Sequence, residues 1–277
     1  MEKFIPTYLR MTEIINNNPN NAEAYYNRGL LIYTFECDFD NSPFQDEDEM
    51  EDEWDDVSEE AALADFEKAI ELDPNLAKAY AMRGNLYLYK AVYWDEEDKF
   101  DPAMADFDQA LSIDKNCKEA YLGKGGFYEK KQAYEKSIDF YSKAIAIDNN
   151  YIAAYRRRSL VYSFINKENE CLNDYNKIIE LAPNDHYTYF ERGTWYFDEG
   201  DYQQSIVDFT QAIKLNRDDD RSYYYYNRGQ AYAGINDKHK AINDFRKTIA
   251  IEETQDEENP AFDYKAEAEN WIEKLIE

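Results

Sequence analysis

HYTYFERGTWYFDEGDYQQSIVDFTQAIKLN, residues 186–216, contains the pattern that decides the fold. Its first half carries an aromatic residue, a small residue four positions later and an apolar residue three beyond that, as Tyr189–Gly193–Tyr196. Its second half has the same spacing in Ser205–Phe209–Ala212. Steps of four and three place side chains on one face of an α-helix. The stretch therefore predicts two amphipathic helices that pack against each other.

The same pattern occurs six times along the chain. The copies of the first half are Tyr25–Gly29–Ile32, Tyr80–Gly84–Tyr87, Tyr121–Gly125–Tyr128, Tyr155–Ser159–Tyr162, Tyr189–Gly193–Tyr196 and Tyr225–Gly229–Tyr232. The small residues are separated by 55, 41, 34, 34 and 36 positions. A basic period of about 34 is typical of stacked helix–turn–helix repeats, in which each repeat buries its apolar face against its neighbours.

The stretch AEAYYNRG, residues 22–29, together with DFEKAIELDPN, residues 65–75, resembles the tetratricopeptide repeat family. The resemblance implies an all-α fold, a right-handed α-solenoid of antiparallel helix pairs. Six full units are expected over 22–255, preceded by a half repeat in 1–21 and followed by a capping helix in 256–277. Insertions are expected at about 37–60 and about 92–101.

Composition limits the possible functions. The 277 residues include 59 acidic and 31 basic side chains, for a formal charge of −28, which argues against nucleic-acid binding. The sequence has no signal-like start and no long apolar run, so a cytoplasmic protein without a membrane segment is expected. A monomer without cofactor or metal is also expected. Its three cysteines are isolated and odd in number, which argues against a disulfide framework.

The first insertion is strongly acidic. Between Phe44 and Glu60, 11 of 17 residues are Asp or Glu, with Trp54 among them. Like charges repel, so a solvated loop is one interpretation. The alternative is an acidic arm that captures a basic partner, with Trp54 as its apolar anchor. The second insertion carries Tyr93, Trp94 and Phe100 and is expected to lengthen the helices or their turn.

A basic residue precedes the small residue of every unit, and in five units an Asp precedes the aromatic of the second helix. The five combinations are Arg28 with Asp65, Arg83 with Asp106, Arg158 with Asp174, Arg192 with Asp208, and Arg228 with Asp244. The unit with Lys124 instead has Phe140 in place of Asp. An Arg fork suits a carboxylate better than Lys does, so Arg–Asp pairs between helices are predicted. The alternative is that these arginines line a binding groove.

In the resembling family, the face of each first helix that points away from its partner lines a concave groove for peptide segments. On this face we place the candidate partner-binding residues Tyr26, Tyr33, Asn85, Leu88, Tyr89, Arg156, Leu160, Phe190, Thr194, Phe197, Tyr223, Tyr226 and Gln230. Tyrosine offers a large contact area with little loss of rotamer freedom. The alternative is that neighbouring helices bury several of these side chains.

These patterns favour a non-enzymatic scaffold that binds a protein or peptide segment. An acidic inhibitor or immunity-type protein that neutralises a basic partner is the alternative. An enzyme is not supported, because His186 and His239 are isolated and no nucleophile–base set recurs.

Overall fold

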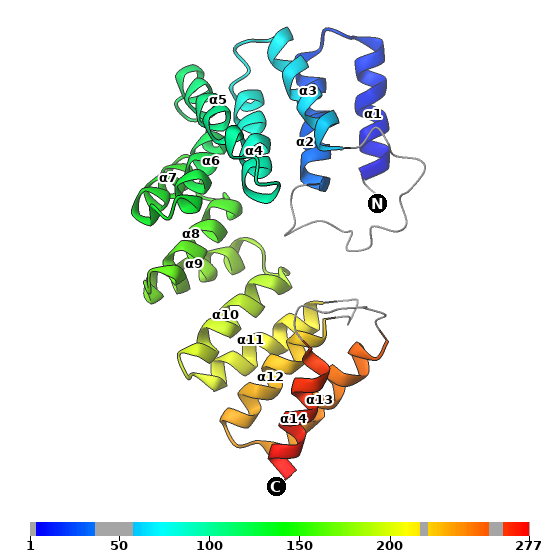
Figure 1. The fold of residues 1–277 in the computed structure, drawn as a ribbon, viewed down its shortest axis with the longest axis vertical. Coiled ribbons are helices and arrows are strands. Elements are labelled where there is room, and N and C mark those ends of the chain that lie inside the picture. The colour runs from blue at the N-terminus through cyan, green and yellow to red at the C-terminus, as the bar shows by residue number, and fades with distance from the viewer. Residues whose placement is uncertain (1–3, 37–57, 217–220, 255–262, 277) are drawn as a thin grey trace. The chain divides into compact units, whose positions relative to one another are not determined.

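A computed structural model of the chain describes residues 4–36, 58–216, 221–254 and 263–276, and this part is helical without any strand (Figure 1). The fold is all-α. The helices are α1 (Phe4–Asn17), α2 (Ala22–Glu36), α3 (Glu59–Leu72), α4 (Ala77–Tyr93), the 3₁₀ helix η2 (Glu97–Lys99), α5 (Phe100–Ile113), α6 (Lys118–Lys130), α7 (Tyr134–Ile147), α8 (Ile152–Phe164), α9 (Glu168–Leu181), α10 (His186–Asp198), α11 (Tyr202–Leu215), α12 (Ser222–Gly234), α13 (Lys238–Glu252) and α14 (Tyr264–Ile276).

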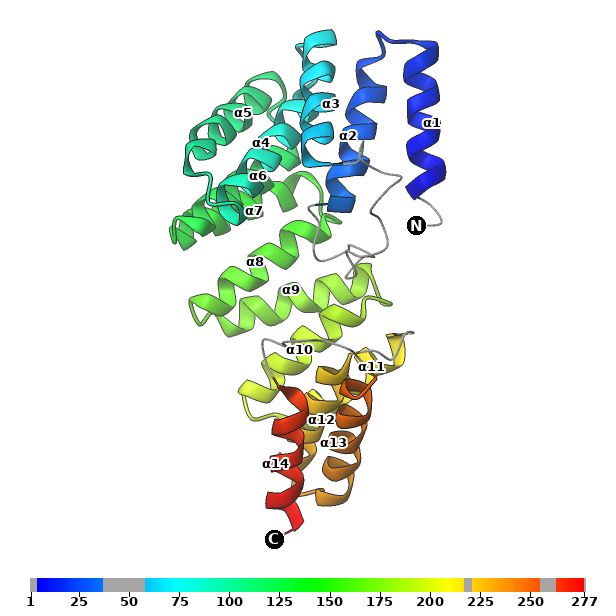
Figure 2. The same cartoon turned by 45° about the vertical axis from the view of Figure 1, so that its right-hand side comes forward.

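The chain forms two compact units, Met1–Ile165 and Asn166–Glu277. In unit 1, α2 packs on α3, α4 on α5 and α6 on α7, and each pair contacts the next. In unit 2, α10 packs on α11 and α12 on α13, while α14 lies beside α12 and α13 (Figure 2). Helix pairs therefore pack in sequence order. The right-handed twist expected for the whole array stays a prediction, as does the pairing of α8 with α9.

The core of each helix pair is a small residue packed under an aromatic ring. A Cβ atom added to Gly193 would lie 2.8 Å from Cδ1 of Phe209, and one added to Gly125 would lie 2.3 Å from Cε1 of Tyr141. Both aromatic rings are completely buried. Glycine lowers helix propensity by about 0.8–1 kcal/mol relative to alanine, but here it permits a helix approach that alanine would block.

Two kinds of turn connect the helices. Inside the pairs, a residue with positive φ follows the first helix, as in Gln132 (φ 55°) and Gly200 (φ 77°). Between pairs, the side chain of an Asp accepts a hydrogen bond from the backbone N–H two residues later, at Asp73, Asp114 and Asp148. This turn depends on the Asp side chain. It therefore forms in IDKN and IDNN as well as in LDPN, which explains why the repeats do not require proline.

Four of the five expected Arg–Asp pairs are present in the structure. The guanidinium forks onto the carboxylate with two hydrogen bonds of 2.6–2.8 Å in Arg28–Asp65, Arg83–Asp106, Arg192–Asp208 and Arg228–Asp244. The Asp side chains are at most 10% exposed. Arg158 and Asp174 belong to different units, and their pairing stays a prediction.

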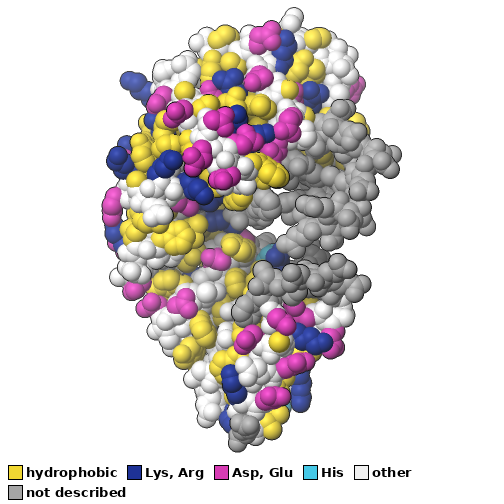
Figure 3. Space-filling view, viewed as in Figure 1, with side chains coloured by type: hydrophobic (Ala, Val, Ile, Leu, Met, Phe, Trp, Pro, Cys, Tyr) yellow, Lys and Arg dark blue, Asp and Glu magenta, His cyan; other side chains and the backbone are white. Residues whose placement is uncertain are grey.

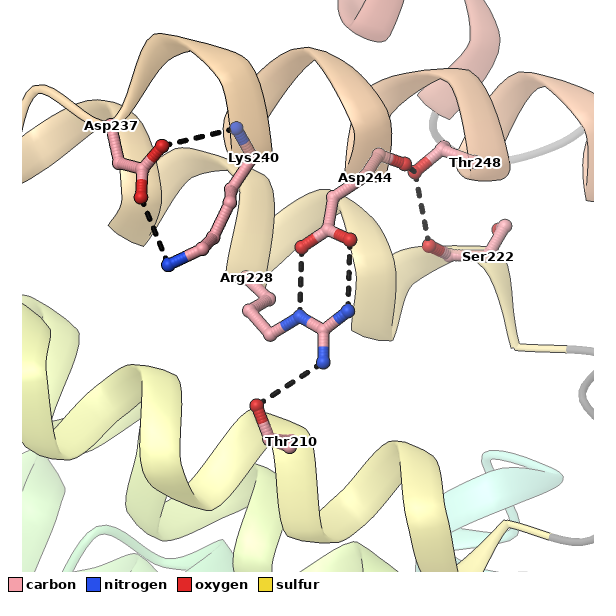
Figure 4. A network of polar contacts seen from close by, with 7 residues as sticks. All are labelled: Thr210, Ser222, Arg228, Asp237, Lys240, Asp244 and Thr248. Atoms are coloured by element: carbon pink, nitrogen blue, oxygen red, sulfur yellow. Dashed lines mark hydrogen bonds and ion pairs between the residues drawn. The ribbon is translucent and has the colours of Figure 1, made fainter.

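Three of these four arginines also form a hydrogen bond with the preceding helix. Nη1 of Arg228 donates to Oγ1 of Thr210 on α11 while the fork holds Asp244 on α13 (Figure 4). Equivalent hydrogen bonds join Arg192 to Asn176 and Arg28 to Thr12. The guanidinium of Arg228 lies 5.6 and 5.9 Å from the ring centres of Tyr225 and Tyr232, within cation–π range. The arginine column therefore serves the scaffold.

Candidate functional site

Within each unit, first helices contact one another directly. In unit 1, α2 contacts α4, α4 contacts α6 and α6 contacts α8; in unit 2, α10 contacts α12 and α12 contacts α14. We call the surface formed by these helices, on the side away from their second helices, the first-helix face of each unit. All thirteen candidate partner-binding residues belong to first helices.

Two of these candidates are buried. Tyr26 and Tyr226 are each 6% exposed, and their rings pack on Phe66 and Phe245 at centroid distances of 6.3 and 5.8 Å. These two tyrosines are therefore buried by neighbouring helices, which was the alternative to a role in binding. Neither ring offers contact area to a partner. The outward position that the repeat spacing assigns to them is filled by the adjacent helices.

The other unit 1 candidates are half-buried: Tyr33, Asn85, Leu88, Tyr89, Arg156 and Leu160. Cδ2 of Leu88 on α4 lies 3.3 Å from the place where a side chain on Gly126 of α6 would begin. Oδ1 of Asn85 lies 2.5 Å from the corresponding point on Gly123. Glycines on α6 therefore leave the space that these two α4 side chains occupy. The result is a surface of apolar and amide side chains that packing against α6 holds in place.

A polar cluster that the sequence analysis did not identify lies at the start of α6. The thiol of Cys117 donates to Oε2 of Glu119 over 3.6 Å, and Nζ of Lys118 lies 4.5 Å above the ring of Tyr151, just before α8. Burial first, and the Glu119 carboxylate second, raise the pKa of Tyr26 and of Tyr151 above the ordinary phenol value. Both phenols therefore stay protonated at neutral pH.

Glu119 itself forms no ion pair with any side chain in the described part of the chain, while neighbouring Lys118 pairs with Asp148 at 2.5 Å. A half-buried carboxylate without a cation is electrostatically unsatisfied and attracts one. Burial also raises the pKa of the Cys117 thiol to about 12, so the thiol adds no second charge. The sequence does not single out Glu119, because the chain contains many acidic residues. It does not single out Tyr151 either, because this residue lies in a connection between repeats.

Arg156 and its neighbour in the sequence, Arg157, are placed differently. Arg157 is exposed, with Nη1 3.9 Å from Oε1 of Glu129, whose other oxygen accepts a 2.5 Å hydrogen bond from Tyr141. Arg156 is half-buried on α8. The two arginines therefore differ in exposure.

The first-helix face of unit 2 is mainly aromatic. Phe190 stacks on Tyr224 at 4.8 Å and meets Tyr223 edge-on at 5.0 Å, and Tyr223 lies 6.2 Å from Tyr264 of α14. Nδ1 of His186 and the Tyr224 hydroxyl are 2.7 Å apart. Three helices thus contribute to one aromatic cluster, in which Phe190 and Tyr223 are half-buried.

The remaining unit 2 candidates are also half-buried. Phe197 packs on Tyr202 at 5.3 Å, and Nε2 of Gln230 donates to the Tyr226 hydroxyl over 3.2 Å. Oγ1 of Thr194 is buried and has no hydrogen-bond partner among the residues that the structure describes. Trp54, the proposed anchor of the acidic loop, lies outside the described residues, as does most of that insertion.

Acidic side chains are dispersed over the visible surfaces of both units, interspersed with basic and hydrophobic ones (Figure 3). No group of three or more His, Cys, Asp or Glu side chains in the described ranges is arranged to hold a metal ion. None of the helices in those ranges combines the length and apolar character needed to traverse a lipid bilayer.

Comparison with known proteins identifies the repeats. One sequence-family model described as "Tetratricopeptide repeat" matches residues 58–76, 186–219 and 222–255, and a second with the same description matches residues 92–152. Together they cover more than half of the chain.

Individual relatives match over shorter stretches. Tetratricopeptide repeat protein 13 from Homo sapiens is 28% identical over 108 residues, which are 39% of this chain and 12% of that protein. Hsp70-Hsp90 organizing protein 1 from Arabidopsis thaliana is 43% identical over 51 residues, 18% of this chain and 9% of the relative. The matched stretches span about a tenth of the length of these relatives.

Among solved structures, YrrB, described as a TPR protein with an unusual peptide-binding site, superposes with a TM-score of 0.56. It is 23% identical, and the match covers 74% of this chain and 97% of YrrB. At this identity the likeness concerns the fold.

Proposed function

The chain belongs to the tetratricopeptide repeat family, and from this premise we propose that it is a non-enzymatic scaffold that binds a protein or peptide segment on its first-helix faces. The observation that carries the proposal is the set of half-buried aromatic and aliphatic side chains on these faces, above all Tyr33, Leu88, Phe190 and Tyr223. They are fixed by neighbouring helices on one side and accessible on the other.

Such side chains suit recognition because binding costs them little conformational entropy. Phe190 and Tyr223 are held by ring contacts of 4.8–5.0 Å, and Leu88 by α6. A partner that covers them gains buried apolar area without first ordering the surface. The peptide-binding site described for YrrB supports a peptide as the ligand class, although that site is a property of YrrB.

A second candidate is a protein that neutralises a basic partner, and Glu119 favours it. Its carboxylate, near Tyr26 and Tyr151, would be satisfied by an ammonium or guanidinium group of a bound segment. The formal charge of −28 would speed the approach of such a partner. The two candidates differ in whether apolar contacts or charge dominate the affinity.

The proposal is tested by selecting binding peptides from a displayed random library and measuring their affinity for variants. Tyr33→Ala combined with Leu88→Ala is expected to weaken peptides that bind unit 1 by about tenfold or more. Val207→Ala is the matched control, because Val207 is 59% exposed on α11, a second helix. Selected peptides that bind all variants equally would contradict the first-helix face as the site.

Glu119→Gln separates the two candidates, since it keeps the shape of the side chain and removes its charge. If a basic partner is the ligand, this variant and added salt should weaken binding together. If apolar contacts dominate, both changes should leave the affinity of the selected peptides nearly constant.

A further inference from the structure

Two large aromatic side chains lie open to solvent at the end of α4. Tyr93, the last residue of α4, is 58% exposed, and Trp94, which follows it, is 61% exposed, although the other side of this helix is buried. The ring of Tyr89 packs 4.7 Å from that of Tyr93. These residues begin the insertion at 92–101, which the repeat pattern does not require. Contiguous exposed apolar surface that the core does not require is characteristic of interaction sites.

Trp94 is held in this position by polar contacts. Its indole N–H donates to Oε1 of Glu59 over 3.1 Å, joining the end of α4 to the start of α3. Lys90, one turn earlier, forms an ion pair with Glu60 at 2.8 Å and lies 3.7 Å from Glu59. Asp95 then turns the chain with a positive φ of 58°. The indole is therefore fixed at the surface.

The indole forms one wall of a hollow of about 320 Å³. The hollow is lined by Ser58, Glu59, Glu60, Lys90, Trp94 and Glu96. Three carboxylates face one ammonium group, so the lining carries a net negative charge. The hydrogen bond from Lys90 lowers the pKa of Glu60, which keeps that carboxylate ionised at neutral pH. The volume is near the lower limit of known ligand pockets and accommodates a side chain.

We propose that this hollow is a second binding site, which takes one arginine side chain from a protein segment. A planar guanidinium can stack on the indole while its N–H groups reach the carboxylates, whereas a lysine ammonium lacks both the plane and the fork. The charge of the lining determines the class of partner, because an acidic lining beside an aromatic face repels anions and favours cations. The site lies outside the first-helix faces, so it extends the proposed function and stands without it.

The test uses the full chain, labelled with ¹⁵N and observed at its indole N–H signals by NMR. The sequence has four tryptophans, and Trp94→Phe identifies the signal of Trp94. The probe is an acetylated, amidated tri-arginine peptide, with tri-citrulline as the uncharged match and tri-lysine as the second cation. Tri-arginine is expected to shift the Trp94 signal saturably, more than the signal of Trp271 on α14, and to bind about threefold more tightly than tri-lysine.

The variant that tests the lining is Glu59→Gln with Glu60→Gln, in which an amide oxygen can still accept the indole hydrogen bond. It should weaken the response of Trp94 to tri-arginine by about threefold or more. Glu168→Gln with Glu170→Gln is the matched control, because these two residues are exposed in the first turn of α9. The two substitutions remove the same amount of charge as those at Glu59 and Glu60. The control should leave the response of Trp94 unchanged.

Three results would overturn the site: a Trp94 signal that tri-arginine does not move, an equal response to tri-citrulline, or equal losses in the two double variants. An equal response to tri-lysine would contradict the choice of arginine. Unchanged circular dichroism spectra of the variants would establish that they fold.

Discussion

The α10–α11 and α6–α7 pairs share the repeat motif but differ at the two positions of the Arg–Asp pair. In α10–α11, Arg192 lies between Tyr189 and Tyr196 and forks onto Asp208. In α6–α7, Lys124 and Phe140 take the places of Arg192 and Asp208. Here the two tyrosines of the column stack on Phe140 instead, at centroid distances of 6.3 and 5.4 Å.

The lysine of α6–α7 forms a different ion pair. Its Nζ reaches Asp108 on α5 at 2.5 Å, and that carboxylate is 64% exposed. Asp208, in contrast, is 4% exposed. The same pair of tyrosines thus accommodates either a guanidinium with a buried carboxylate, or a benzene ring beside an ammonium group whose carboxylate partner is exposed. The comparison teaches that the two positions vary as one, because a buried Asp without its Arg would be an unpaired charge.

The largest effect is expected on breaking the buried pair. Arg192→Met should lower the free energy of unfolding by about 3–5 kcal/mol, because it leaves Asp208 buried without a cation. Asp208→Leu should also be destabilising, and the double variant should lose less than the sum of the two. Urea unfolding of the three variants measures this coupling. Additive losses would show that the two residues do not stabilise the fold as a pair.

Glycine substitutions test how closely the helices approach in the two pairs. Gly125→Ala should cost about 2 kcal/mol and more than Gly193→Ala, since the new Cβ would lie 2.3 Å from Tyr141 against 2.8 Å from Phe209. Gly126→Ala is the control on the same helix, because its nearest neighbour is a terminal methyl of Leu88 at 3.3 Å. Its melting temperature should stay close to that of the parent. Equal losses at Gly125 and Gly126 would contradict the close approach.

Converting one pair into the other sharpens the comparison. Phe140→Asp alone should destabilise α6–α7, because it removes the stacking with Tyr121 and Tyr128 and adds an unpaired charge. Adding Lys124→Arg should restore about 1–2 kcal/mol by rebuilding the fork between the tyrosines. Thermal unfolding of the two single variants and the double variant measures the recovery. No recovery would mean that α6–α7 cannot adopt the geometry of α10–α11.

The smallest effect is expected for Lys124→Met, at about 0.5 kcal/mol, since an ion pair with an exposed carboxylate contributes little. Arg192→Met, measured beside it, provides the contrast. The effect should shrink further at high salt because exposed charges are screened. A loss as large as that of Arg192→Met would show that Lys124 has a buried role.

Much of this fold follows from the sequence, because the spacing of aromatic and small residues directly encodes helix faces. The Arg–Asp pairs could also be predicted, since the exception at Lys124 coincides with the exception at Phe140. The third hydrogen bond of Arg28, Arg192 and Arg228 could not, because its acceptors Thr12, Asn176 and Thr210 differ in residue type and share only their function as hydrogen-bond acceptors.

The candidate site was less predictable than the scaffold. Helical spacing separates one face from another but does not say how far a neighbouring helix covers that face, which is why Tyr26 and Tyr226 are buried while Tyr33 and Tyr223 are partly open. Glu119 and Tyr151 come together from α6 and from the connection before α8. No local pattern reports such an approach.

The three-way contact of the arginines has a consequence for how the molecule unfolds. Arg228 holds α11, α12 and α13 at once through Thr210 and Asp244. A helix pair that opens therefore takes with it a hydrogen bond of the preceding pair, which raises the free energy of opening any single pair by itself. Neighbouring pairs should exchange their amide hydrogens at similar rates, as one cooperative segment, wherever an arginine connects them. At α6–α7, Lys124 reaches Asp108 on α5, but Phe140 stands in place of the aspartate on α7, so this side chain connects two helices and not three.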